Sequence, residues 1–386
     1  MTASSSLALS PASPGSPAHD VLIRGGGPVG MALALALAHG GLRVGLLGAA
    51  PKKDAAPDVR AYALNAGSVG LLQALRVWDA LPEDARTAVH DMRIHGDGGG
   101  AIDFSAWQQG VGELAWIVDA AALEQSLGEA VRYAPHVQRL TQAAAAPLTA
   151  VCEGKDSTTR EQLGAGFESF AYGHHGIAAR LVSDTPHQGA AWQWFRHPDV
   201  LALLPFDRPQ AAHGFGLVWS QPQAEAERLL VLSDAEFEAE LNAATGAAAG
   251  TLRLASPRMA WPLRIGQAQR WCGPGWVLLG DAAHAVHPLA GQGLNLGLAD
   301  VQALARVLAE ARRASPWKSL GDERTLRRYA RERSTPTRAM SGLTDGLLHL
   351  FAQPSAPLKE LRNQGMTLVH HLGPLKRWLT SRALDA

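Results

Sequence analysis

Cysteine, charged residues and long hydrophobic runs are all scarce in this 386-residue chain. Its two cysteines, Cys152 and Cys272, cannot form a disulfide framework and make no C-x-x-C pair for zinc, which favours a reducing, cytoplasmic setting. The 35 basic residues equal the 35 acidic ones, so no general attraction to nucleic acid is expected. Charged residues make up 18% of the chain and apolar residues 47%, a composition that excludes a wholly disordered protein.

The longest apolar run, Val29 to Ala38, is far shorter than the roughly 20 residues that a membrane-spanning helix needs. Residues 1–19 are rich in Ser, Pro and Ala and lack the basic start and sustained apolar core of a signal peptide. We predict that they form a disordered tail. Glycine, by contrast, is abundant: the chain has 40, which indicates many tight turns or close approaches between backbone and ligand.

The pattern of residues predicts an α/β protein with an insertion. Residues 20–24 are expected to form a strand, 25–30 a glycine-rich turn, the chain to about His39 a helix, and 42–47 a second strand. This is the start of a βαβ layer.

Further along, the elements return to the same layer after a β-rich stretch. Helices are predicted for 66–75, 120–131 and 234–244, a β-sheet for 176–219, a strand for 276–279 and a helix from about Gly293. Residues 136–151 are Ala-rich, and we expect little strand character there. One nucleotide-binding layer with a β-rich insertion would produce this order.

The first glycine turn carries the dinucleotide-binding pattern at Gly25, Gly27 and Gly30, between a strand and a helix. Without Cβ atoms the chain turns tightly and brings backbone N–H groups to a diphosphate, and the helix N-terminus adds partial positive charge.

The acid expected about 20 residues later to bind the ribose is missing, because Gly48 ends the second strand and Lys52 and Lys53 follow. Two interpretations of this turn stay open. A lysine would bind the 2′-phosphate of NADP, or the ribose of FAD would be held with one hydrogen bond fewer.

A second motif runs from Trp276 to Asp300. A strand ends at Asp281, which can accept hydrogen bonds from a sugar-like polyol. A Pro/Gly loop follows, and a helix begins at Gly293-Leu294-Asn295. That helix N-terminus would favour negative charge on the N1/O2 edge of a reduced flavin.

This second motif resembles that of the ubiquinone-biosynthesis hydroxylases, which are FAD-dependent aromatic monooxygenases with the para-hydroxybenzoate hydroxylase fold. The resemblance spans nearly the whole chain after the tail. Residues 58–64 match a family segment in which an arginine, here Arg60, contacts FAD. Residues 152–160 match the family's Asp-Gly-x-x-Ser-x-x-Arg motif, with Glu153 in place of the aspartate.

The resemblance implies a Rossmann-like FAD-binding domain with an inserted β-sheet substrate domain and a helical C-terminal region. We assign residues 20–175 and 262–386 to the first and 176–261 to the second. NADH or NADPH would donate electrons transiently. The residues expected to bind FAD are Gly25, Gly27, Gly30, Arg60, Asp281, Pro288, Gly291, Gly293, Leu294 and Asn295.

The implied activity is hydroxylation of a phenolic, polyprenylated ring in ubiquinone biosynthesis. O2 would add at flavin C4a, and the hydroperoxide would transfer OH to the ring. No catalytic side chain is assigned. The C-terminal helices, with Leu and Trp among Lys and Arg, either pack on the domain or form an interfacial surface for a polyprenyl substrate, which would place the protein at the inner membrane face. A homo-oligomer or a biosynthetic complex would accommodate such an enzyme.

Three departures from the family, Gly48, Glu153 and the short segment 136–151, leave a second interpretation open. The chain would then be a degenerate, non-catalytic paralogue that serves as a subunit of a biosynthetic complex. A third interpretation, an NADP-dependent dehydrogenase using Lys52 or Lys53, leaves the Asp281 motif unexplained.

Other chemistries have weaker support. Asp281, His284 and His287 could ligate a metal, but the resemblance assigns their loop to flavin, so no metal is predicted. Ser157 lacks the G-x-S-x-G elbow of a hydrolase. Four tryptophans are predicted mainly as sheet core, with a minority lining the substrate pocket: Trp192, Trp194, Trp219 and Trp261.

Overall fold

The computed structural model describes residues 18–48, 58–96, 100–196, 198–286, 292–335 and 337. Several residues singled out from the sequence lie outside this described part. They are the predicted tail up to residue 17, Lys52, Lys53, His287, Pro288, Gly291 and the predicted helices after residue 337.

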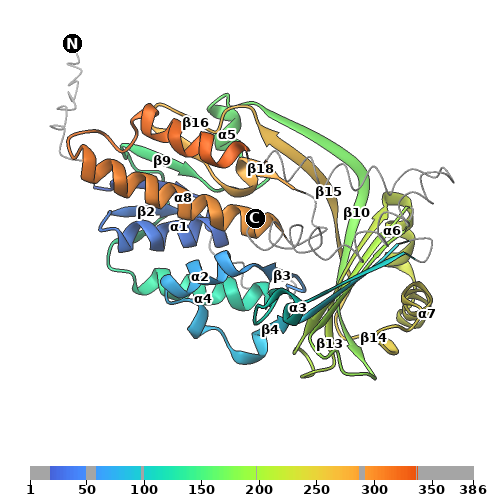
Figure 1. Ribbon diagram of the computed structural model, residues 1–386. Helices are drawn as coiled ribbons and strands as arrows, with labels where there is room; N and C mark the ends of the chain where they lie inside the picture. The colour runs from blue at the N-terminus through green and yellow to red at the C-terminus, as the bar shows by residue number, and fades with distance from the viewer. Residues whose placement is uncertain are drawn as a thin grey trace, which may run out of the picture.

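The nucleotide-binding layer is a six-stranded sheet (Figure 1). Its strands lie in the order β16 (Cys272–Gly273), β17 (Trp276–Leu278), β9 (Leu148–Val151), β1 (Val21–Arg24), β2 (Val44–Leu47) and β8 (Val137–Leu140). Every neighbouring pair is parallel except β16 with β17. The predicted βαβ start is confirmed, because α1 (Pro28–His39) connects β1 to the adjacent, parallel β2.

The expectation that residues 136–151 have little strand character is wrong. This segment supplies both β8 and β9, and β9 lies beside β1 at the centre of the sheet. Leu148, Ala150 and Val151 are fully buried. A short parallel strand buried on both faces shows no polar/apolar alternation, so only a brief apolar run marks it in the sequence.

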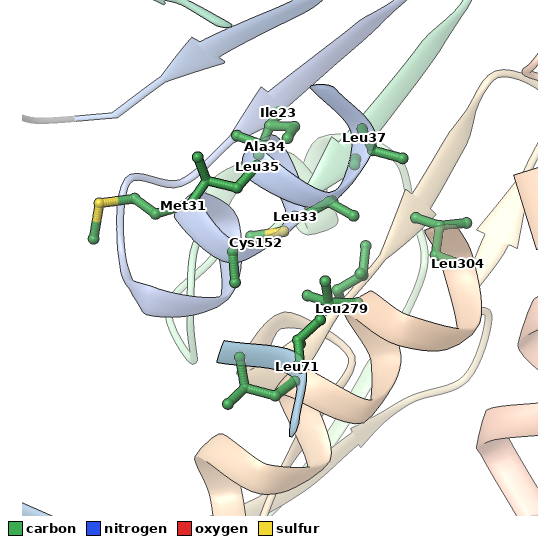
Figure 2. Packing of buried hydrophobic residues seen from close by; sticks show 14 of the residues in the cluster. Ile23, Met31, Leu33, Ala34, Leu35, Leu37, Leu71, Cys152, Leu279 and Leu304 are labelled. Carbon is green, nitrogen blue, oxygen red and sulfur yellow. The ribbon is translucent and has the colours of Figure 1, made fainter. Parts of the chain in front are cut away.

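Helix α1 is enclosed on all sides. It packs against the sheet, against α8 (Gln292–Ala314) and against α4 (Ala120–Tyr133). Figure 2 shows Leu33 and Leu35 of α1 with Leu279 and Leu304 in one cluster, and all four are buried. Burying each such side chain stabilises the fold by about 1.5–3 kcal/mol, so the N-terminus of α1 sits on a rigid support.

The second large element is a nine-stranded sheet. Its main order is β18 (His284–Ala285), β15 (Met259–Ala268), β10 (Phe167–Ser183), β13 (Gly214–Pro222), β12 (Val200–Phe206), β11 (Ala190–Phe195), β5 (Asp91–His95) and β6 (Ala101–Ser105), with β14 (Leu252–Leu254) beside β10. Helices α6 (Gln223–Val231) and α7 (Asp234–Thr245) cover its outer face (Figure 1). The predicted α/β class with an added β-sheet is confirmed. The domain boundaries stay a prediction, and β10 and β15 run through both of them.

A three-stranded sheet lies between these two parts. It consists of β3 (Ala61–Leu64), β7 (Ala115–Asp119) and β4 (Arg86–Val89). Its residue Ile117 shares a buried cluster with Phe206 of β12. Beside it, Arg180 of β10 donates to Asp119 at 3.2 Å and to the carbonyl oxygen of Arg60 at 2.7 Å. The inner face of the large sheet is therefore fixed against the nucleotide-binding part.

None of the helices in the described ranges is long and apolar enough to cross a membrane.

Candidate functional site

The carboxyl ends of three adjacent parallel strands bring the sequence motifs together. The glycine turn follows β1, residues 152–157 follow β9, and the Gly280–Asp281 turn follows β17. Strand β9 pairs with both of the others, so the three turns meet at one edge. Ligands of open parallel sheets bind at this edge.

The three glycines of the first turn have different physical roles. Gly25 has φ of +122°, and a Cβ there would lie 2.2 Å from the carbonyl oxygen of Cys152. A Cβ at Gly30 would lie 1.9 Å from the oxygen of Gly25. Gly27, at the N-cap of α1, has no atom of a described residue other than its chain neighbours within 4 Å of its Cβ position. The first and last glycines therefore allow close packing, and the middle one faces an open cradle that a diphosphate can fill.

Gly48 is explained by a close approach. A Cβ at this position would lie 2.4 Å from the backbone nitrogen of Gly26 and 2.6 Å from its Cα. The end of β2 touches the glycine turn, so any side chain at residue 48, including the expected acid, would displace the turn.

Asp281 lies in a short 3-10 turn, η3 (Gly280–Ala282), whose ends are anchored by other side chains. Asp300 accepts from the backbone N–H of Gly280 at 2.9 Å, and Arg160 donates to the carbonyl oxygen of Ala282 at 3.2 Å. The Asp281 carboxylate has no hydrogen bond or ion pair within the described ranges. Burial raises its pKa, opposed by the charges of Lys155 and His284. The Asp281 carboxylate can therefore accept hydrogen bonds from a ligand.

The N-terminus of α8 faces this carboxylate. A Cβ at Gly293 would lie 3.8 Å from Oδ1 of Asp281. The Asn295 side chain accepts from the N–H of Asn65 at 3.1 Å and from the hydroxyl of Ser68 at 2.7 Å. Asn295 thus fixes the helix against α2 (Ala66–Ala74), and Leu294 packs against the core. Contact of Gly293, Leu294 and Asn295 with FAD stays a prediction.

Arg60 precedes β3 on the other side of the site. Its guanidinium pairs with Asp58 at 2.6 Å and Glu124 at 3.2 Å and lies 5.7 Å from the centre of the Tyr62 ring. Its hydrogen bond with Asp58 raises the pKa of the arginine further. Contact of Arg60 with FAD stays a prediction.

The third motif forms a hydrogen-bonded loop around the substituted acid. Glu153 accepts from Arg24 at 3.0 Å, from the Ser157 hydroxyl at 2.8 Å, and from both the hydroxyl and the N–H of Thr159. Burial would raise the pKa of Glu153, but these hydrogen bonds outweigh it and lower the pKa. These hydrogen bonds hold the Glu153 side chain in a fixed position at the edge of the site.

Sequence reasoning missed a buried network behind the Asp281 turn. Asp300 of α8, fully buried, accepts from Nε2 of His284 at 2.6 Å and from Nε of Arg333 at 2.8 Å. The sequence presents His284 only as a possible metal ligand and Asp300 only as the end of a motif. Within the described ranges, no group of three His, Cys, Asp or Glu side chains is arranged to hold a metal ion.

The tryptophans divide between the two faces of the large sheet. Trp194 and Trp219 belong to the buried cluster under α6 and α7, with Trp192 packed against it, which confirms their prediction as core. Ala260 also packs against that cluster, so its neighbour Trp261 points to the opposite face, toward the nucleotide-binding part.

Two nucleotide-type turns meet at one edge of the sheet. There the Asp281 carboxylate, without a partner in the described ranges, faces a helix N-terminus. This arrangement is typical of a flavin-dinucleotide-binding protein of the doubly wound class. The FAD binding domain family matches residues 18–119 and 105–342 of this chain. The chain is 31% identical to ubiquinone hydroxylase UbiL of Rhodospirillum rubrum, covering 95% of this chain and 89% of that protein. It is 30% identical to the 3-demethoxyubiquinol 3-hydroxylase of Escherichia coli, covering 95% and 98%.

The fold has solved counterparts. The p-nitrophenol 4-monooxygenase PnpA of Pseudomonas putida superimposes with a TM-score of 0.74 at 18% identity, covering 95% of this chain and 98% of that one. The chain belongs to the ubiquinone-hydroxylase family of FAD-dependent aromatic monooxygenases. FAD is its cofactor, and NAD(P)H is the usual electron donor of the family. This decides between the two interpretations of the first glycine turn in favour of FAD.

Proposed function

We propose that this enzyme hydroxylates a phenolic, polyprenylated ring in ubiquinone biosynthesis, with O2 and NAD(P)H as co-substrates. FAD, once reduced by NAD(P)H, would activate O2 so that one of its oxygen atoms is transferred to the ring and the other leaves as water. The observation that carries the proposal is the unpartnered Asp281 carboxylate facing the N-terminus of α8 at the edge where the glycine turn lies. The sequence relatives named above support the choice of substrate class.

The protein's own contribution is positioning and exclusion of water. Gly27 leaves room for the diphosphate, and Asp281 is placed to hold the polyol chain. The α8 N-terminus, held through Asn295, would stabilise negative charge on the ring of the flavin. The phenol would lie between the flavin and the inner face of the nine-stranded sheet, where Trp261 is placed to contact it. Apolar side chains on this face, such as Val218, would keep water from the reacting atoms.

The proposal is tested by reconstituting the purified protein with FAD, desalting it and recording its visible spectrum. We expect the bands of oxidised flavin at stoichiometric content. Turnover is then measured with phenols that carry or lack a prenyl tail, and incorporation of oxygen from 18O2 is followed by mass spectrometry. A colourless protein would support the non-catalytic subunit interpretation, and flavin-containing protein without oxygen incorporation would reject the hydroxylase.

We also propose that the enzyme binds its substrate at a membrane surface. A long polyprenyl chain partitions into a bilayer, so the enzyme would take it at a membrane surface, as a peripheral protein, within a homo-oligomer or a biosynthetic complex. We expect prenylated phenol presented in vesicles to be hydroxylated faster when the vesicles bind the enzyme. Equal rates for vesicle-bound and detergent-dispersed substrate would argue against surface delivery.

Asp281→Ala is expected to weaken FAD binding without destabilising the fold. Within the described ranges the carboxylate makes no hydrogen bond or ion pair that the fold would lose, so the free energy of unfolding of the apoprotein should not fall. A hydrogen bond to a charged group contributes about 1.5–3 kcal/mol, which corresponds to about a tenfold to hundredfold higher Kd. The measurement is a fluorescence titration of apoprotein with FAD.

The matched control for this prediction is Asp79→Ala. Asp79 is exposed and lies in the 3-10 turn at Trp78–Ala80, outside the three turns of the site. It should leave the Kd for FAD unchanged. An Asp281→Ala protein that keeps the wild-type Kd would remove the polyol contact from the proposed site.

A further inference from the structure

The loop after β9 joins the two flavin-binding turns. The carbonyl oxygen of Cys152 and the nitrogen of Glu153 abut Gly25, at 2.2 and 2.9 Å from where its Cβ would be. Further on, the Arg160 guanidinium donates to the carbonyl oxygen of Lys155 at 2.8 Å and to that of Ala282 at 3.2 Å. One buried arginine therefore holds Lys155 beside the Asp281 turn.

The backbone that carries Lys155 is rigid. Gly154 has φ of +82°, which a side chain would disfavour, and it turns the chain toward residue 155. Glu153 ties this loop to Arg24 and to Thr159 on the far side of Lys155. Such a preorganised loop loses little entropy when its lysine binds a ligand.

Lys155 is half-buried, and its side-chain ammonium group has no hydrogen bond or ion pair within the described ranges. Burial raises the pKa of Asp281, and the positive charge of Lys155 opposes this rise. The neighbouring arginines are already engaged, Arg24 with Glu153 and Arg160 with backbone carbonyl groups.

Among the residues that the structure describes, little other positive charge lies at the diphosphate site. The first turn of α1, Pro28 to Met31, contains neither an acidic nor a basic side chain. Its N-terminus offers only N–H groups and a partial charge of about half a unit. Gly48 also removes the acid that would hold the ribose, so binding of FAD loses one hydrogen bond.

We propose that Lys155 binds the diphosphate of FAD and so offsets the ribose contact that Gly48 removes. This rests on the proposed function only in that FAD occupies the Gly25–Gly30 and Asp281 turns. Lys155 is neither a glycine of the fingerprint nor a defining residue of the Asp-Gly-x-x-Ser-x-x-Arg motif.

The test compares FAD with riboflavin, which lacks phosphate, on apoprotein. Lys155→Met keeps most of the apolar stem and removes the charge. We expect its Kd for FAD to rise by about tenfold, its Kd for riboflavin to stay unchanged, and the dependence of FAD binding on salt to flatten. Lys155→Arg should recover most of the affinity for FAD.

Lys318→Met is the matched control. Lys318 is exposed and follows α8, near Gly321, which contacts Gly275 before β17. It therefore lies at the amino edge of the sheet, opposite the site, and its loss should change neither Kd. The melting temperature of each apoprotein shows whether the variants fold.

Three results would overturn the proposal: equal losses of FAD and riboflavin affinity in Lys155→Met, no loss at all, or a higher KM for NAD(P)H with the FAD Kd unchanged. The last would place the lysine at the diphosphate of the electron donor. Because the assay measures FAD binding and not turnover, its outcome is independent of the proposed hydroxylase function. Wild-type protein that binds FAD through Lys155 but hydroxylates no phenol would contradict only the function.

Discussion

Gly30→Ala is expected to abolish retention of FAD and to destabilise the apoprotein. The new Cβ would lie 1.9 Å from the carbonyl oxygen of Gly25, and a backbone oxygen cannot rotate away. Gly25 in turn has little room to shift, since the position of an added Cβ there lies 2.2 Å from the carbonyl oxygen of Cys152. Overpacking of this kind costs about 1–3 kcal/mol of the free energy of unfolding. Opening the turn would also move the N-terminus of α1, so we expect a Kd for FAD on the order of a hundredfold higher.

Two further glycine variants separate folding from binding. Gly27→Ala places a methyl group in open space at the N-cap of α1, so it should weaken FAD binding while changing the free energy of unfolding by less than about 1 kcal/mol. Gly70→Ala, on the exposed side of α2, has no neighbour within 4 Å and should stabilise the protein by up to about 1 kcal/mol. Denaturant unfolding and FAD titration measure both quantities. A Gly30→Ala protein as stable as the wild type would contradict the close approach.

The glycine turn and the helices beside it could be predicted because the residues that determine them are close together in the sequence. The turn at Gly25–Gly30 and helix α1 are encoded within twenty residues, and the structure has them at the expected positions. The helix from Gly293 begins one residue earlier, at Gln292. Each depends on backbone conformation and helix capping, which neighbouring residues determine.

The features that could not be predicted depend on contacts between segments that are far apart in the sequence. Strand β9 pairs with β1 across more than a hundred residues, and its four residues carry no pattern of their own. Likewise, β5 extends the large sheet by pairing with β11, far along the chain. At the site, Gly48 indicates in the sequence only the loss of the acid that would bind the ribose. The sequence does not show that the backbone of Gly26 occupies the space that a side chain at residue 48 would need.

The role of Asn295 shows the same limit at the level of one residue. Its position in the motif predicts contact with the cofactor, and that contact stays a prediction. The sequence does not show that its side chain also accepts from Asn65 and Ser68 and donates to the carbonyl oxygen of Ala63 at 2.8 Å. These partners lie about 230 residues away, so a motif can mark the helix N-terminus but not the task of each side chain.

Asp300→Ala is expected to have the largest effect on stability of any substitution considered. Asp300 is fully buried and is the common acceptor for Gly280, His284 and Arg333. Removing one partner of a buried ion pair costs about 3–5 kcal/mol, because the remaining charge is left without compensation. The Asp281 turn would also lose the acceptor that holds its first residue, so FAD binding should weaken at the same time.

Asp300→Asn separates charge from shape. The amide can still accept from His284 and Gly280, but its NH2 group would then face the Nε–H of Arg333, placing two donors together. We expect a smaller loss of stability than in Asp300→Ala. The exposed Asp79→Ala, in the 3-10 turn at Trp78–Ala80, should change neither stability nor FAD binding.

The two Asp300 variants also predict a pH dependence. Burial would raise the pKa of Asp300, but the charges and hydrogen bonds of His284 and Arg333 outweigh it and lower the pKa below the ordinary value of 3.8. A carboxyl whose pKa is lower in the folded state stabilises fully above its unfolded pKa and loses this as the pH falls through the folded value. The stability difference between wild type and Asp300→Asn, measured by urea unfolding, should therefore be constant near neutrality and shrink below about pH 4. A difference that stays constant into acid would mean that the carboxylate charge does not stabilise the fold.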